Sequence, residues 1–287
     1  MIFLIILMNV LLLIYVLRKN KEGQLFKKKK RYLICILFGV IAFVLSLIIE
    51  WVFEFILSLS FANYYKIVDD KLVWTSLVAQ LIYYFIDCFL IIAIVEELSK
   101  FLPMFLVIEN NYWERKTKFD CILPFLIVTI TCSIIEDIMY IYVYDLSSST
   151  GILRLLTEFS GHTLWGLISG IGYYKYTVKT KAESIKYGIK KLKGEDNPNY
   201  NFINTGMFSD TILIIHILIV TVLHGIFDFL VFNNFVVILI IFSVICTIYC
   251  IQRIVKLKNS DILLESIIQY KRYDLDTTEE MIKEVLN

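Results

Sequence analysis

Long apolar runs dominate this sequence and limit the structures that it can form. Several exceed the roughly 18 consecutive apolar residues that mark a membrane-spanning helix. Hydrophobic residues make up 58% of the chain, compared with about 45–50% in a soluble domain. Because the runs are continuous rather than alternately apolar and polar, they predict an all-α, polytopic transmembrane helical bundle. The predicted spans lie at 2–17, 32–57, 77–108, 119–145, 153–178, 209–232 and 235–256.

Basic residues alternate between the connecting segments and predict the orientation of these seven spans. They gather after the first, third, fifth and seventh spans, at 18–31, 115–118, 175–193 and 253–258. Cytosolic loops carry an excess of Lys and Arg, so we expect the N-terminus outside and the C-terminus in the cytosol. We expect an integral membrane helical domain at 1–258 and a cytosolic tail at 259–287. The loop at 179–207 has apolar residues at helical spacing among lysines, which is typical of a surface helix.

Charge and cysteine content exclude several classes of protein. The formal net charge is +1, and the six cysteines lie in or beside apolar runs without a Cys-x-x-Cys pair. They predict neither a disulfide framework nor a thiolate metal site. The sequence has no glycine-rich phosphate loop and no nucleic-acid signature, so we expect the lipid bilayer, and not a nucleic acid, among its partners.

Ionisable side chains interrupt the third run at Glu96, Glu97 and Lys100. Glu96 and Lys100 are four residues apart and share a helix face, whereas Glu97 lies about 100° around the helix. Charges at membrane depth are costly, and they usually face a protein interior where they serve function. Adjacent carboxylates cannot both ionise cheaply in a low dielectric, which poises one as a general base. The structural alternative is a salt bridge that orders the bundle.

Two further spans carry polar residues of types found in catalytic sites. In the fourth span, Glu136 and Tyr140 share a helix face. In the fifth, His162 precedes Gly166 and Gly170, whose spacing permits the close approach of another helix. A lone buried histidine is more often structural, so His162 becomes a candidate site residue only together with the other polar residues.

The sixth span carries His224 and Asp228 four residues apart. Their side chains project together, a spacing that suits a shared metal or an oriented imidazole. His216, eight residues earlier, is not accompanied by an acidic residue at helical spacing, so we interpret it as structural.

Depth connects these residues. Glu136, His162 and His224 each lie about eight or nine residues from the outer end of their span, or roughly 12–14 Å below the outer surface. Glu96 lies near the middle of its run. We therefore expect four helices to bring carboxylates and imidazoles to a common layer.

The order and spacing of these motifs resemble the PrsW family of intramembrane proteases. This family belongs to a wider group that includes the CAAX prenyl endopeptidases and bacteriocin-processing or immunity proteins. Four short motifs carry the resemblance: Glu96-Glu97-x-x-Lys100, Glu136-Asp137-x-x-Tyr140, His162 with the glycines after it, and His224-x-x-x-Asp228.

Two positions depart from the pattern. Asp137 stands where the family has Asn, and Asp228 stands where the wider group often has Asn. An ionised aspartate cannot donate a hydrogen bond to an oxyanion. The change favours metal binding by Asp228, or orientation of His224, over an oxyanion-hole role.

The resemblance implies an intramembrane endopeptidase, typically in the bacterial cell membrane, that cleaves a membrane-associated protein such as an anti-sigma factor near its extracytoplasmic side. It implies Glu96 or Glu97 as the general base for a water. His162 and His224 would hold a metal or position that water, and Lys100 would adjust the carboxylates. Glu136, Tyr140 and Asp228 would support the site.

Metal dependence stays open at this point. His162, His224 and Asp228 are the candidate metal ligands, and such residues suit a zinc site with an open water position. The related prenyl endopeptidases, in contrast, are viewed as metal-independent glutamate proteases.

Two other functions also stay open. Buried carboxylates and histidines mark ion paths in proton- or ion-coupled transporters, although the sequence shows no inverted repeat of the kind that many such proteins have. A non-enzymatic, bacteriocin-immunity-like membrane protein would keep the motifs without turnover. Cleavage of a candidate substrate distinguishes the three.

Overall fold

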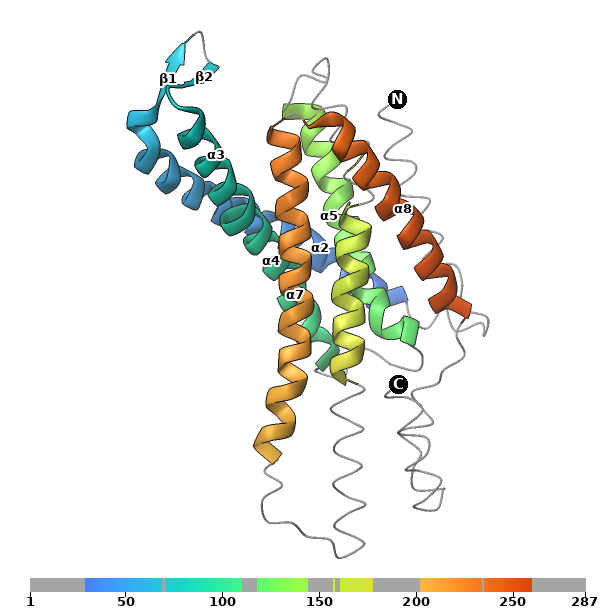
Figure 1. Ribbon diagram of the computed structural model, residues 1–287. Coiled ribbons are helices and arrows are strands. Elements are labelled where there is room, and N and C mark those ends of the chain that lie inside the picture. Colours follow the sequence, from blue (N-terminus) through green and yellow to red (C-terminus); the bar gives the residue numbers. More distant parts are fainter. Residues whose placement is uncertain are drawn as a thin grey trace, which may run out of the picture.

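The computed structural model describes residues 29–68, 71–109, 118–143, 157, 161–177, 202–233 and 235–259. Helices make up nearly all of the described chain, which confirms the predicted all-α bundle (Figure 1). Five helical stretches are long and apolar enough to cross a membrane: Tyr32–Tyr64, Leu77–Phe105, Phe119–Met139, Thr211–Phe232 and Val236–Leu257. A further helix at 161–177 lies within the predicted fifth span.

The described helices match the predicted runs with modest shifts at their ends. The predicted spans that each form one uninterrupted labelled helix are α2 (Lys29–Phe61), α5 (Lys118–Val143), α7 (Phe202–Phe232) and α8 (Val236–Asn259). α7 begins before the predicted sixth span, inside the segment expected to be a loop. The predicted span at 2–17, most of the loop at 179–207 and nearly all of the tail at 259–287 lie outside the described residues. The number of spans and the sides of the two ends stay predictions.

Reporter fusions test the predicted topology directly. Fusions after Lys30 and after Lys191 should both report the cytosol, because the flanking segments carry the Lys and Arg excess. A third fusion in the segment between the second and third predicted spans should report the opposite side. An extracytoplasmic signal at either basic segment would contradict the seven-span topology.

The segment between the second and third predicted spans forms a β-hairpin that the sequence analysis did not predict. Strands β1 (Tyr65–Val68) and β2 (Lys71–Trp74) pair antiparallel after the short 3₁₀ helix η2 (Ala62–Tyr64), with Tyr65 opposite Trp74. Aromatic and β-branched residues favour strands. The Trp74 ring lies 5.1 Å from that of Tyr83, and clustered Trp and Tyr rings are typical of a membrane–water interface.

The third predicted span is one continuous helical path with three segments. It consists of α3 (Leu77–Ile86), a π-helical segment η3 (Asp87–Ile92) and α4 (Ala93–Glu109). A helix of this length, at about 1.5 Å per residue, is longer than one straight crossing of the bilayer requires. α3 and α2 run obliquely from the hairpin toward the centre of the bundle, and such a tilt accommodates the additional length (Figure 1). π-helical turns are rare and frequently occur at functional sites. This one immediately precedes the segment that carries Glu96 and Glu97.

α5 is the central helix of the bundle, and small residues let its neighbours approach it. In its most apolar stretch 83% of the residues are buried, the highest share among the five candidate membrane spans. Gly39 of α2 faces Thr131, and Gly166 faces Thr129. Gly170 lies directly against the backbone of Ile122. The predicted close approach at Gly166 and Gly170 is therefore present, and α5 is the partner.

Adding one methyl group at Gly170 should destabilise this packing. In Gly170→Ala the new Cβ would lie 2.8 Å from the Ile122 Cα, and because that atom belongs to the backbone the two helices must separate. Overpacking of this kind costs about 1–3 kcal/mol, measurable as a lower thermal unfolding midpoint in detergent. Gly161→Ala is the matched control on the same helix, since its Cβ would meet Trp165 at an ordinary 3.4 Å. Equal midpoints for the two variants would contradict the close contact.

Candidate active site

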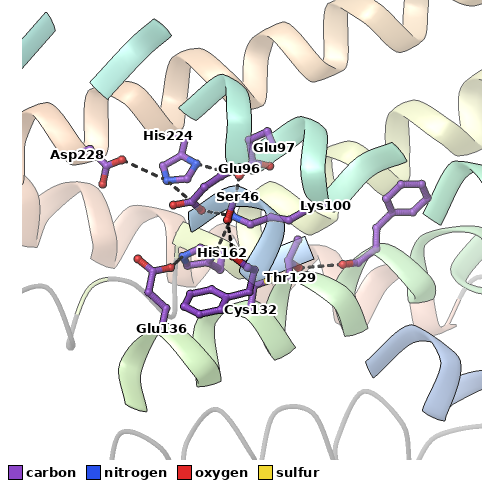
Figure 2. Close-up of polar contacts among 12 residues, drawn as sticks. Ser46, Glu96, Glu97, Lys100, Thr129, Cys132, Glu136, His162, His224 and Asp228 are labelled. Carbon is purple, nitrogen blue, oxygen red and sulfur yellow. Dashed lines mark hydrogen bonds and ion pairs between the residues drawn. The ribbon is translucent and has the colours of Figure 1, made fainter. Parts of the chain in front are cut away.

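Four helices bring the predicted carboxylates and imidazoles into one buried cluster (Figure 2). α4 supplies Glu96, Glu97 and Lys100, α5 supplies Glu136, the helix at 161–177 supplies His162, and α7 supplies His224 and Asp228. None of these seven residues is more than 7% exposed. The common layer expected from span depths is therefore present as a set of direct contacts.

Lys100 lies at the centre of the cluster. Its ammonium donates to Glu96 Oε2 at 2.5 Å and to Glu97 Oε1 at 3.1 Å, and Nζ lies 3.3 Å from His162 Nδ1. The predicted Glu96–Lys100 pair is confirmed. Glu97 joins it from the i, i+3 position, so one ammonium holds both adjacent carboxylates in fixed positions.

His224 is held by contacts from several directions. Its Nδ1 lies 2.9 Å from Glu97 Oε1, and its Nε2 lies 3.3 Å from Asp228 Oδ2 and 4.0 Å from Glu96 Oε2. The ring of Trp165 stacks on the imidazole at 5.7 Å. The predicted pairing of His224 with Asp228 is present, and the ring has little freedom to rotate.

His162 has a similar environment to that of His224. Its Nε2 lies 3.2 Å from Glu136 Oε2, and its ring centroid lies 5.8 Å from that of His224. Each imidazole thus meets a carboxylate at Nε2, and its Nδ1 faces Lys100 or the carboxylate that Lys100 binds. Carboxylates that accept from one ring nitrogen commonly orient histidines at metal sites.

The donor atoms of the cluster fit a metal ion. Two buried groups each place three ligand atoms within 4.8 Å of one another: Glu96, Glu97 and His224, and Glu96, Glu136 and His162. Glu96 belongs to both. Imidazole and carboxylate are the ligand types of catalytic zinc. The seven residues include four carboxylates and one ammonium, so a cation would also relieve an excess of buried negative charge.

The structure separates some other predicted residues from these two groups. Asp228 belongs to neither group and contacts His224 instead. Tyr140 falls within α5, but its side chain lies outside the described part of the chain. His216 Nδ1 lies 2.7 Å from the Ile212 carbonyl oxygen, and its side chain lies against Gly172. These contacts agree with the interpretation of His216 as structural.

The sequence analysis missed polar residues from two further segments. Ser46 and Glu50 of α2 and Asp87 of the π-helical segment are buried, and Glu54 of α2 is half-buried. The spacing of Ser46, Glu50 and Glu54, four residues apart within an apolar run, was a signal that could have indicated a shared inward face. The π-helical segment has no comparable sequence signal.

Comparison with known proteins identifies the family. A model described as PrsW family intramembrane metalloprotease matches residues 27–194, more than half of the chain. The match includes Glu96, Glu136 and His162, whereas His224 and Asp228 lie beyond it and join the site through the contacts above. No curated protein and no solved structure matched the chain. The family match and the apolar helices agree with the motifs: the chain is a multi-pass membrane protein that belongs to the PrsW family of intramembrane metalloproteases.

Proposed function

We propose that this chain is a zinc-dependent endopeptidase that cleaves a membrane-associated protein near the extracytoplasmic side of the membrane, with a water activated by a glutamate. The observation that carries the proposal is the position of Glu96, which belongs to both buried groups of potential metal ligands. A carboxylate between two imidazoles, with a second carboxylate beside it, supplies both a ligand set and a base for hydrolysis.

In this proposal Glu96, His162 and His224 would hold the metal ion. Two histidines and one glutamate form a known ligand set of catalytic zinc, which leaves a fourth position for water. When bound, a zinc ion acidifies that water and polarises the carbonyl group of the substrate. Asp228 and Glu136 orient the two imidazoles through Nε2, a role that differs from the sequence-based expectation of Asp228 as a ligand.

Glu97 is the proposed base. It accepts a proton from the attacking water on a carboxylate oxygen while the water oxygen bonds to the peptide carbonyl carbon. The peptide C–N bond then breaks, and the proton passes to the leaving nitrogen. Lys100 donates to Glu97 at 3.1 Å, which fixes the carboxylate and balances its charge during these transfers.

The proposed substrate is a membrane-anchored protein, such as the anti-sigma factor that the family resemblance implies, in a bacterial cell membrane. The positive-inside rule predicts that the hairpin end of the bundle lies outside. Asp228 is four residues from the end of α7 at Phe232, the same end to which Figure 1 shows the hairpin directed. This arrangement supports cleavage near the extracytoplasmic side.

Metal removal tests the proposal. Purified protein should contain about one zinc ion per chain, and it should cleave a membrane-anchored reporter peptide. A strong chelator should abolish cleavage, and added zinc should restore it, since the ligand set has no other source of a Lewis acid. Elemental analysis and a cleavage assay on the same sample make the measurement. Full activity of metal-free protein would contradict the role of zinc and would indicate that carboxylates alone activate the water. Zinc binding without cleavage of any membrane-anchored peptide would contradict the protease function.

A further inference from the structure

α2 carries an acidic face in a half whose other residues are mostly exposed and apolar. Ser46, Glu50 and Glu54 follow one another at intervals of four residues, so they lie along one side of the helix. Glu50 is only 8% exposed. The neighbouring Trp51 and Phe55 are 71% and 58% exposed. The aromatic side chains therefore face lipid, and the carboxylates face the protein.

Asp87, at the start of the π-helical segment, adds a third carboxylate to this region. It is 6% exposed. Neither its Oδ1 nor Oε1 of Glu50 has a hydrogen-bond partner among the described residues. A buried polar atom without a partner is costly in an apolar environment, and a membrane interior offers no compensation. Such atoms are expected to face a hydrated or ion-bearing space.

Electrostatic interactions link these carboxylates to residues on both the His162 side and the His224 side of the candidate site. Glu50 lies within electrostatic reach of Glu54, Glu96 and Glu136, and of the Lys100 ammonium at the site itself. Asp87 lies within similar reach of Glu54 and Asp228. Glu54, which is half-buried and nearest the hairpin, is therefore common to two branches. One branch leads through Glu50 to the His162 group, and the other leads through Asp87 to the His224 group.

We propose that Glu54, Glu50 and Asp87 form an acidic pathway through which a hydrated divalent cation passes from the hairpin end of the bundle to the candidate site. A pathway for water alone would need polar groups, but these groups would not all have to carry charge of the same sign. Three carboxylates in a low dielectric repel one another, and a passing cation relieves that repulsion. A row of one sign also concentrates counter-ions and accelerates their association by about 10–10³-fold.

This inference rests on metal binding in the proposed function, so the experiment separates the two. Metal-stripped protein in nanodiscs is mixed with excess zinc, and loading is followed over time through the change in tryptophan fluorescence, to which Trp165 contributes because it stacks on His224. A zinc indicator measures uptake independently, and elemental analysis gives the final zinc content. The variants are Glu54→Gln, Glu50→Gln and Asp87→Asn, which keep side-chain shape and remove charge. Asp120→Asn, a buried carboxylate near the start of α5, is the matched control.

Each pathway variant should load zinc about 10-fold or more slowly than the unmodified protein, and all should reach the same final zinc content. The control variant should load at the unmodified rate. Unchanged loading rates in all three variants would overturn the pathway, and so would a reduced final content, because the carboxylates would then be ligands and not a route. Absence of zinc uptake by the unmodified protein would instead contradict the proposed metal site. A thermal unfolding curve for each variant excludes misfolded samples.

Discussion

Glu97→Gln is expected to lower substrate cleavage by roughly 10²–10⁴-fold, because it removes the base at the chemical step. The amide retains the size of the side chain and an oxygen that can still accept from Lys100, which now lies 3.1 Å from the carboxylate. The variant should therefore accumulate in the membrane and retain its zinc. Turnover of a membrane-anchored reporter and zinc content, measured on the same preparation, check both statements.

Glu96→Gln supplies the contrast. Glu96 belongs to both groups of potential ligands, so this variant should lose zinc together with cleavage. Asp120→Asn, which removes a buried carboxylate outside the cluster, should keep both. The reverse pattern, with zinc lost in Glu97→Gln and kept in Glu96→Gln, would exchange the two roles. Near-normal cleavage by both glutamate variants would eliminate the catalytic roles proposed for Glu96 and Glu97.

The second large effect concerns His162 and His224, whose ring centroids are 5.8 Å apart. If both imidazoles hold one metal ion, His162→Ala and His224→Ala should each remove nearly all activity. The double variant should be little worse than either single one, because groups that act as a unit lose most of their effect at the first substitution. Initial cleavage rates, normalised to the amount of folded protein, give the three values.

His216→Ala is the matched control on α7. His216 contacts the carbonyl of its own helix, so its loss should affect stability more than turnover. Multiplicative losses in the double variant would indicate that the two site histidines act independently. If His162→Ala lowers only membrane abundance and the remaining protein is fully active, His162 is a packing residue and the site reduces to Glu96, Glu97 and His224.

Local geometry explains why part of the site could be predicted from the sequence. A helix fixes which residues share a face, so the contacts of Glu96 with Lys100 and of His224 with Asp228 follow from four-residue spacing. The length of each apolar run fixes where a helix crosses the bilayer, and this placed Glu136 and His162 at one depth. The family motifs consist of these same local units, which is why the resemblance identified the family correctly.

Contacts between distant segments required the tertiary structure. Glu97 and His224 are 127 residues apart in sequence and meet at 2.9 Å, and no spacing rule fixes which carboxylate faces which imidazole. The rotation of α4 depends on the π-helical turn before it, because an inserted residue shifts every later side chain around the helix axis. The spacing of residues within α4 alone does not reveal that shift.

The acidic face of α2 likewise combines a feature that the sequence determines with one that only the tertiary structure decides. The sequence places Glu50 and Glu54 on one side of a helix within an apolar run, but in a membrane apolar residues suit both the lipid and the protein interior. Hydrophobic pattern therefore does not decide which side of α2 faces inward. That side is decided by steric fit, since Gly39 permits α2 to approach Thr131 of α5 and thereby directs Glu50 toward the site.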